Sequence, residues 1–140
     1  DNAIRRAKIA MRDGTLKGIL WHQGESNAAS RKDASAWGKR FVDMIGRMRA
    51  ELGDVPVVAG ELGAYLKDNK NAKGECNFSG AEVLNEGLHA AEGTLAKFAV
   101  ASAKDLKPNA DNLHFDEPSL RIFGRRYAEA MRAICLRSRS

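Results

Sequence analysis

Cysteine and long apolar runs are both scarce in this sequence, and each scarcity excludes a class of protein. Two cysteines occur among 140 residues, Cys76 and Cys135, and no C-x-x-C pair is present. A recognisable zinc or thiol-redox motif is thereby excluded, while a disulfide between the two cysteines stays open. No run approaches the roughly eighteen consecutive apolar residues of a membrane span, and residues 1–14 lack the apolar segment of a signal peptide. We therefore expect no membrane partner, and the question of export stays open.

Acidic residues are scarce at the C-terminal end, and the net charge of +5 arises there. Residues 121–140 contain six arginines against one glutamate, and the rest of the chain is balanced. Arginines in the last turns of a terminal helix interact favourably with the helix dipole, so a solvated helix end accounts for them. We expect no nucleic-acid partner.

Apolar periodicity predicts helices that alternate with short strands. The chain has 140 residues, 44% of them hydrophobic, which suffices for one domain with its own core. The expected elements, in chain order, are helix 3–13, strand 16–21, a helix from a cap at Asp33 to Gly53, strand 55–60, loop 67–77, helix 79–91, strand 97–102 and a last helix opened by Asp116 or Glu117. We predict that one face of the last helix carries Leu120, Phe123, Tyr127, Met131 and Ile134. The alternation is typical of an α/β fold, here a three-layer α/β/α architecture with a parallel sheet.

Polar side chains follow each of the three predicted strands. The segment from Gln23 to Asn27 follows the first strand, Glu61 follows the second, and Asp111 and His114 follow the third at some distance. Open parallel sheets bind ligands beyond the carboxyl ends of their strands, so we expect these residues to share one rim. This rim is the predicted functional site.

Three of the rim residues suggest acyl-transfer chemistry. A carboxylate at Asp111 that accepts from one imidazole nitrogen of His114 would leave the other nitrogen to take a proton from a nucleophile. The D-x-x-H spacing is common and also fits a loop histidine bonded to a neighbouring cap. Gln23 could donate to a developing oxyanion.

The remaining polar residues of the segment 22–27 have several interpretations. Glu25 could act as a general base, pair with a histidine, accept from a sugar hydroxyl, or be held by backbone amides at the turn. Ser26 in G-E-S-N resembles a nucleophile turn, but seven residues, 27–33, separate it from the next helical pattern, whereas a nucleophile elbow passes directly from strand to helix. His22, and still more His89 inside a predicted helix, are interpreted as packing or surface residues.

The stretches "LWHQGESNA" (20–28) and "DNLHF" (111–115) together resemble the SGNH-type hydrolases. Within them the resemblance is to the sialate O-acetylesterase and acetylxylan esterase group, carbohydrate esterase family 6. It spans nearly the whole chain, because "PVVAGELG" (56–63) also fits. The resemblance implies hydrolysis of acetyl esters on xylan or sialic acid-type sugars, with no cofactor and no metal.

The resemblance also implies roles for individual residues. Gln23 would help form the oxyanion hole, and His114 would be the general base. Asp111 would orient His114 in most members, while Glu25 would do so in others, and both carboxylates are kept as candidates. Weaker substrate-binding candidates on the same rim are Gly24, Ser26, Asn27 and Glu61.

One block of the family pattern is missing. The nucleophile of these esterases lies in a G-Q-S-N motif after the first strand, followed by a glycine of the oxyanion hole, and neither occurs here. We therefore expect residues 1–140 to be the C-terminal portion of a single esterase domain, inactive alone, with the serine supplied by a missing N-terminal segment. Such a sheet would expose a strand edge and apolar helix faces. The alternative is a non-catalytic carbohydrate-binding or interaction module, and secretion or a periplasmic location stays open.

Overall fold

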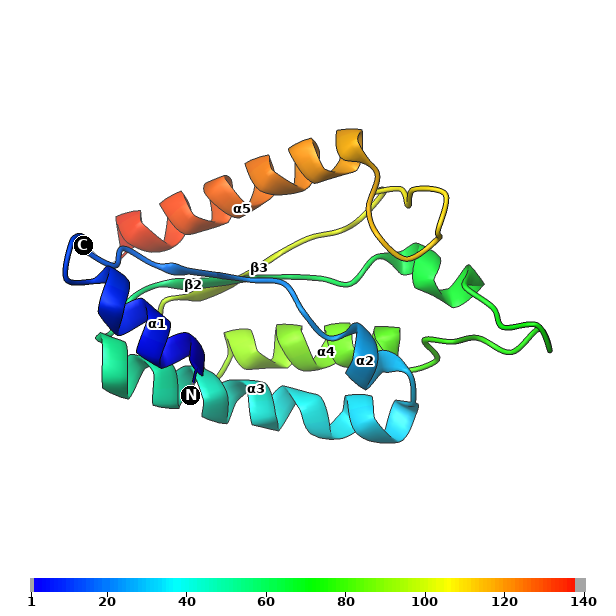
Figure 1. Ribbon diagram of the computed structural model, residues 1–140, viewed down its shortest axis with the longest axis horizontal. Coiled ribbons are helices and arrows are strands. Elements are labelled where there is room, and N and C mark those ends of the chain that lie inside the picture. The colour runs from blue at the N-terminus through cyan, green and yellow to red at the C-terminus, as the bar shows by residue number, and fades with distance from the viewer. Residues whose placement is uncertain (1, 138–140) are drawn as a thin grey trace.

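Three parallel strands form the centre of the structure, a computed structural model that describes residues 2–137 (Figure 1). They lie in the order β1-β2-β3, with helices on both faces of the sheet. The elements are α1 Asn2–Ala10, β1 Ile19–Trp21, α2 Glu25–Ala28, α3 Arg31–Leu52, β2 Val57–Gly60, the 3₁₀ helix η1 Ala64–Asp68, α4 Ala81–Glu92, β3 Phe98–Ala101 and α5 Glu117–Arg137. The predicted α/β fold with a three-layer α/β/α arrangement is confirmed.

The central strand β2 is buried on both sides, and its alternating side chains enter two different cores. Val57 and Ala59 pack into the larger core beneath α3 and α4, together with Ile45 and Leu88. Val58, between them in sequence, packs into the second core beneath α5. A continuous apolar run is what a parallel strand covered by helices on both faces requires.

Helix α5 approaches β2 so closely that the strand must end in glycine. A Cβ atom on Gly60 would collide with the ring and hydroxyl of Tyr127 and with the ring of Phe123. The Tyr127 hydroxyl also donates to the carbonyl of Trp21, at 2.7 Å. α5 therefore holds the ends of two neighbouring strands in place.

Strand β1 is an edge strand within the described residues 2–137, since it pairs with β2 alone. Leu20 in this strand is 64% exposed, and Leu120 at the start of α5 is 54% exposed. They border an apolar hollow of about 450 Å³ that also touches His22, Phe115 and Met131. Leu120 lies on the predicted face of α5, since it lines this hollow together with Phe123, Tyr127 and Met131, but it is exposed there rather than covered.

Two expectations about the segment after β1 are wrong. Helix α3 is capped by Ser30, not Asp33: the Ser30 hydroxyl accepts from the Asp33 N–H at 3.1 Å and donates to the Asp33 carboxylate at 2.8 Å. Ser30 is therefore the N-cap, three residues before the expected one, and Asp33 supplies the backbone N–H that its hydroxyl satisfies. The expected seven-residue connection after Ser26 is also absent, because Glu25–Ala28 forms the short helix α2.

The other differences are smaller. β1 has three residues rather than six, α1 ends at Ala10, and η1 begins before the loop expected at 67–77.

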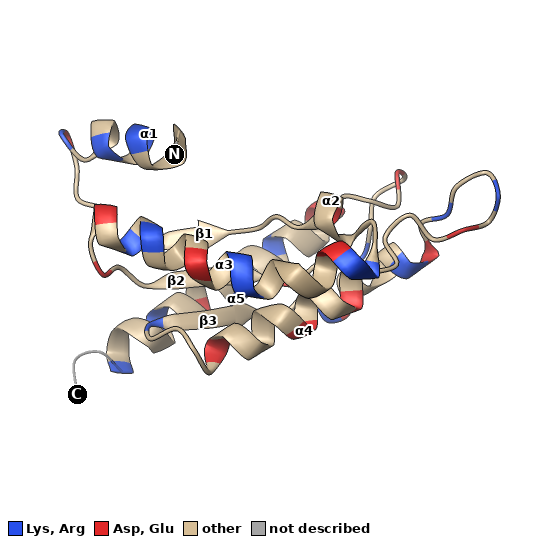
Figure 2. Ribbon diagram, turned by 90° about the horizontal axis from the view of Figure 1, so that it is seen from below, with Lys and Arg blue, Asp and Glu red and all other residues tan. Residues whose placement is uncertain are grey.

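Cys76 and Cys135 are both free thiols. Acidic and basic residues are interspersed along α3 (Figure 2). None of the helices within residues 2–137 has the length and apolar character needed to cross a membrane.

The larger core supplies a stability prediction. Leu88 is 1% exposed and Leu136 is 66% exposed, and both lie on helices. Leu88→Ala should lower the free energy of unfolding by about 2–5 kcal/mol, because it leaves a cavity beneath the sheet, and Leu136→Ala should change it by less than about 0.5 kcal/mol. Urea unfolding of the full-length protein measures both. Equal midpoints for the two variants would contradict the packing described here.

Candidate functional site

The loop that follows β3, residues 109–114, brings Asp111 and His114 together; we call it the dyad loop. The His114 Nδ1 donates to Asp111 Oδ2 at 2.6 Å. The other Asp111 oxygen accepts from the N–H groups of Leu113 and His114, at 2.8 and 2.9 Å. The N–H of Asn109 closes the loop on the carbonyl of His114, at 2.8 Å. The dyad is therefore built by the loop's own hydrogen bonds.

This pairing changes the protonation of both groups. The hydrogen bond and charge of Asp111 raise the pKa of His114, and the charge of Glu25 adds to the rise. The same bond, with the two backbone donors, lowers the pKa of Asp111 to about 2. Asp111 therefore stays ionised near neutral pH. Its bond to Nδ1 leaves Nε2 as the nitrogen that can exchange a proton with a substrate or nucleophile.

Gln23 and Glu25 lie after β1 at the same end of the sheet, where α2 begins. The Gln23 amide donates to Asn27 Oδ1 at 3.4 Å. Glu25 accepts from the N–H of Gly24 at 3.0 Å, so its direct partner is the turn and not His114. Gly24 is buried with φ at 156°, and a Cβ there would collide with Leu84. Of the two candidate carboxylates, Asp111 is hydrogen-bonded to the histidine, and Glu25 acts on it through its charge.

Ser26 lies in the first turn of α2, after Gln23 and Glu25. Its residue is exposed, whereas Asn27 is half-buried. Three residues separate the end of β1 from the start of this helix. The substrate-contacting roles of Gly24, Ser26 and Asn27 stay predictions.

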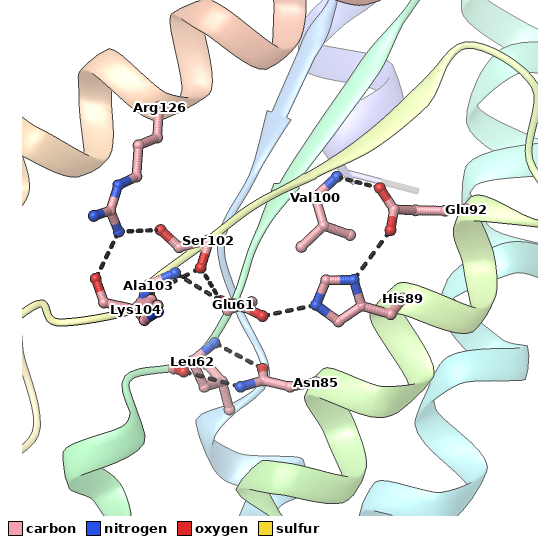
Figure 3. Close-up of polar contacts among 10 residues, drawn as sticks. All are labelled: Glu61, Leu62, Asn85, His89, Glu92, Val100, Ser102, Ala103, Lys104 and Arg126. Atoms are coloured by element: carbon pink, nitrogen blue, oxygen red, sulfur yellow. Dashed lines mark hydrogen bonds and ion pairs between the residues drawn. The ribbon is translucent and has the colours of Figure 1, made fainter.

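Glu61 accepts hydrogen bonds from α4 and from the segment that follows β3 (Figure 3). One carboxylate oxygen accepts from the Ser102 hydroxyl at 2.8 Å and the Ala103 N–H at 2.7 Å. The other oxygen accepts from His89 Nε2 at 2.7 Å, and His89 Nδ1 faces Glu92 at 3.0 Å. Glu61 thus ties β2, the segment after β3, and α4 together. Its contact with a substrate stays a prediction, because its side chain is 18% exposed and both oxygens have partners.

The chain of charges through His89 shifts the pKa of each group. Burial raises the pKa of Glu61, but hydrogen bonds from His89, Ala103 and Ser102 outweigh burial and leave the pKa below its ordinary value. The bonds to Glu61 and Glu92 raise the pKa of His89. Sequence reasoning assigned His89 to packing or surface and found no partner for it, because Glu61 is 28 residues away.

His22 packs, as the sequence interpretation expected. Its ring lies 5.7 Å from the ring of Phe115 and 5.5 Å from that of Phe123. Its Nε2 is 3.3 Å from the carbonyl of Glu61. Within residues 2–137, no three His, Cys, Asp or Glu side chains gather closely enough to hold a metal ion.

Two residues near η1 reach the dyad loop and were missed by sequence reasoning. The Tyr65 hydroxyl donates to the carbonyl of Leu113 at 3.1 Å. The Asn69 amide donates to the carbonyl of Asn112 at 3.0 Å. They follow β2 by a few residues, in a stretch with no motif or periodicity that could have indicated them.

A comparison with protein families identifies the family of this chain. A family model described as carbohydrate esterase, sialic acid-specific acetylesterase, matches residues 1–133. The chain belongs to this family. It is thus a carbohydrate acetylesterase-like domain, of the hydrolase type that the two sequence motifs indicated.

A solved structure of a protein from Arabidopsis thaliana has a similar fold. The two share 21% sequence identity with a TM-score of 0.74 over 93% of this chain. The chain spans about half the length of that protein, since the match covers 50% of it. At this identity the likeness concerns the fold.

Replacing Asp111 should lower the pKa of His114 toward its ordinary value. Asp111→Asn keeps an oxygen for the backbone donors but removes the negative charge that stabilises the imidazolium. NMR titration of the His114 ring in the full-length protein measures the shift, and the His89 ring serves as an internal control because its partners are Glu61 and Glu92. A His114 pKa that responds to Glu25→Gln and ignores Asp111→Asn would contradict the pairing.

Proposed function

We propose that this chain forms the base and oxyanion side of a serine-type O-acetylesterase that acts on xylan or sialic acid-type sugars. The observation that carries the proposal is the 2.6 Å hydrogen bond from His114 to Asp111. It lies at the strand end that also carries Gln23, and the family to which the chain belongs is one of carbohydrate acetylesterases. A carboxylate-paired imidazole can activate a nucleophile, and a side-chain amide at the same end of the sheet can donate to the oxyanion formed in acyl transfer.

In this mechanism His114 moves protons and Gln23 stabilises charge. A serine hydroxyl loses its proton to His114 Nε2 as its oxygen attacks the acetyl carbon, and the oxyanion that forms accepts from the Gln23 amide. The bond to the sugar oxygen then breaks, and that oxygen takes the proton from His114. Water repeats the sequence on the acyl-serine, which releases acetate and restores the serine. Asp111 stabilises the imidazolium in both halves.

The serine comes from a polypeptide segment that pairs with the free edge of β1. Three observations support this source: the unpaired edge in residues 2–137, the exposed Leu20 and Leu120 beside an apolar hollow, and the match to half of a longer chain. Ser26, in the first turn of α2, is not assigned as the nucleophile in this proposal, because the G-Q-S-N motif that holds the nucleophile in the resembling esterases does not occur in residues 1–140. Residues 1–140 alone therefore do not hydrolyse esters.

Loss of the base should abolish activity of the full-length protein. His114→Ala should lower kcat for an aryl acetate or acetylated sugar by about 10³-fold or more, because the serine is no longer activated. Ser26→Ala should lower it by less than about tenfold. Asp111→Asn should lower kcat strongly, and the matched control Asp105→Asn, at an exposed aspartate with a left-handed backbone that asparagine also adopts, should leave it unchanged.

The opposite pattern would overturn the mechanism. Near-normal turnover by His114→Ala removes the proposed base, and complete loss in Ser26→Ala makes that residue the nucleophile. Binding of the acetylated sugar without any turnover would instead support the non-catalytic module.

The pH dependence tests the same assignment. His114 must be neutral to accept a proton, and its pKa is raised by Asp111. We expect kcat/KM to rise with pH through a pKa above the ordinary histidine value of about 6.5. In Asp111→Asn the rise should move to lower pH, together with the fall in rate. A wild-type profile that is flat between about pH 5 and 8 would contradict a histidine base.

A further inference from the structure

The dyad loop receives two side-chain hydrogen bonds from one neighbouring segment. Tyr65 belongs to η1 and Asn69 is the residue that ends it, and their donors reach the carbonyls of Leu113 and Asn112, at 3.1 and 3.0 Å. These carbonyls directly precede His114 along the chain. The two donors therefore hold the backbone that carries the proposed base.

The orientation of the Asn69 amide is set by a second asparagine. Asn77 Nδ2 donates to Asn69 Oδ1 at 2.7 Å, and the Asn77 N–H donates to the Asn69 carbonyl at 2.9 Å. Because the amide oxygen of Asn69 is already an acceptor, its NH₂ group is the part that faces Asn112. The contact is thus specified by its surroundings.

Tyr65 is a donor throughout the working pH range. Burial and the charges of Asp111 and Glu25 raise the pKa of its hydroxyl to about 12, so it keeps its proton. Its ring packs edge-on against Phe115, with ring centroids 5.3 Å apart. Removing the hydroxyl alone would leave this packing intact.

Leu113 and Phe115 pack against the two cores, and Tyr65 and Asn69 add hydrogen bonds to the loop backbone. These outside contacts place the loop on the rim, because the loop's internal bonds fix the dyad alone. Those bonds join Asp111 to the backbone and ring of His114, whereas none of them reaches Gln23. Asn112 has φ at 54°, a left-handed conformation that asparagine adopts more readily than most residues. Its carbonyl is the one that Asn69 holds.

We propose that Tyr65 and Asn69 are positioning residues for the esterase reaction. They keep the dyad loop in its position relative to Gln23, and they touch no reacting atom. The inference rests on the proposed function for the role of His114 as base. Loss of these hydrogen bonds should lower kcat, since a displacement of the base by about 1 Å can cost about a hundredfold in rate.

The test combines kinetics with NMR on the full-length protein. Tyr65→Phe, Asn69→Ala and the double variant should lower kcat, by about 10- to 100-fold in the double variant, with KM changed less than about twofold. The pKa of the His114 ring should stay at the wild-type value, unlike in Asp111→Asn. Asn71→Ala is the matched control, because the side chain of Asn71 bonds within residues 71–75, and it should leave kcat unchanged.

Three results would overturn the proposal. An unchanged kcat in the double variant would mean that the dyad loop keeps its position without the hydrogen bonds from Tyr65 and Asn69. A His114 pKa that falls as it does in Asp111→Asn would mean that the two residues maintain the dyad rather than its place. A raised KM at constant kcat would make them substrate contacts.

A further measurement separates this proposal from the proposed function. If the wild-type protein hydrolyses no acetyl ester, the proposed function fails. Relaxation dispersion of the amides of residues 109–114 still shows whether Tyr65 and Asn69 keep the dyad loop in one conformation. Exchange broadening in the double variant and not in Asn71→Ala supports it. Unchanged relaxation in both variants overturns it.

Discussion

The parallel pairing of β2 with both of its neighbours is the constraint on which the site depends. Trp21 lies opposite Ala59, and Gly60 lies opposite Ala101, so the chain leaves all three strands at one edge. The residues that follow β1 and β2 therefore emerge side by side. Burial of β2 between two helical layers makes a register shift costly, because every apolar side chain would face the wrong core.

Polar contacts secure these strand ends from both faces of the sheet. From the α4 side, His89 donates to Glu61, which also accepts from Ser102 (Figure 3). From the α5 side, Arg126 donates to the carbonyls of Ser102 and Lys104, each at 2.8 Å. Arg126 is one of the six arginines that the sequence indicated as a solvated helix end, yet it has a structural role. Partly buried charges with several partners rigidify the rim beside the proposed site.

The site and the exposed edge of the sheet are adjacent. The apolar hollow beside β1 is lined by Phe115, the residue after His114, and by His22, the residue before Gln23. A segment that covered this hollow would contact the residue that follows the dyad and the residue that precedes the proposed oxyanion donor. In the proposed mechanism, the segment that supplies the serine would cover this hollow and so would pack beside the base and the oxyanion donor.

Local patterns in the sequence were enough to determine the layers, the three strands and the shared rim, because apolar periodicity and motif spacing extend over a few residues. The Asp111 and His114 contact is of this kind, three residues apart. Tertiary structure alone decided that His89 pairs with Glu61 and that Tyr65 reaches the dyad loop, across 28 and 48 residues. Such contacts depend on how helices pack across the sheet, and no local pattern records that geometry.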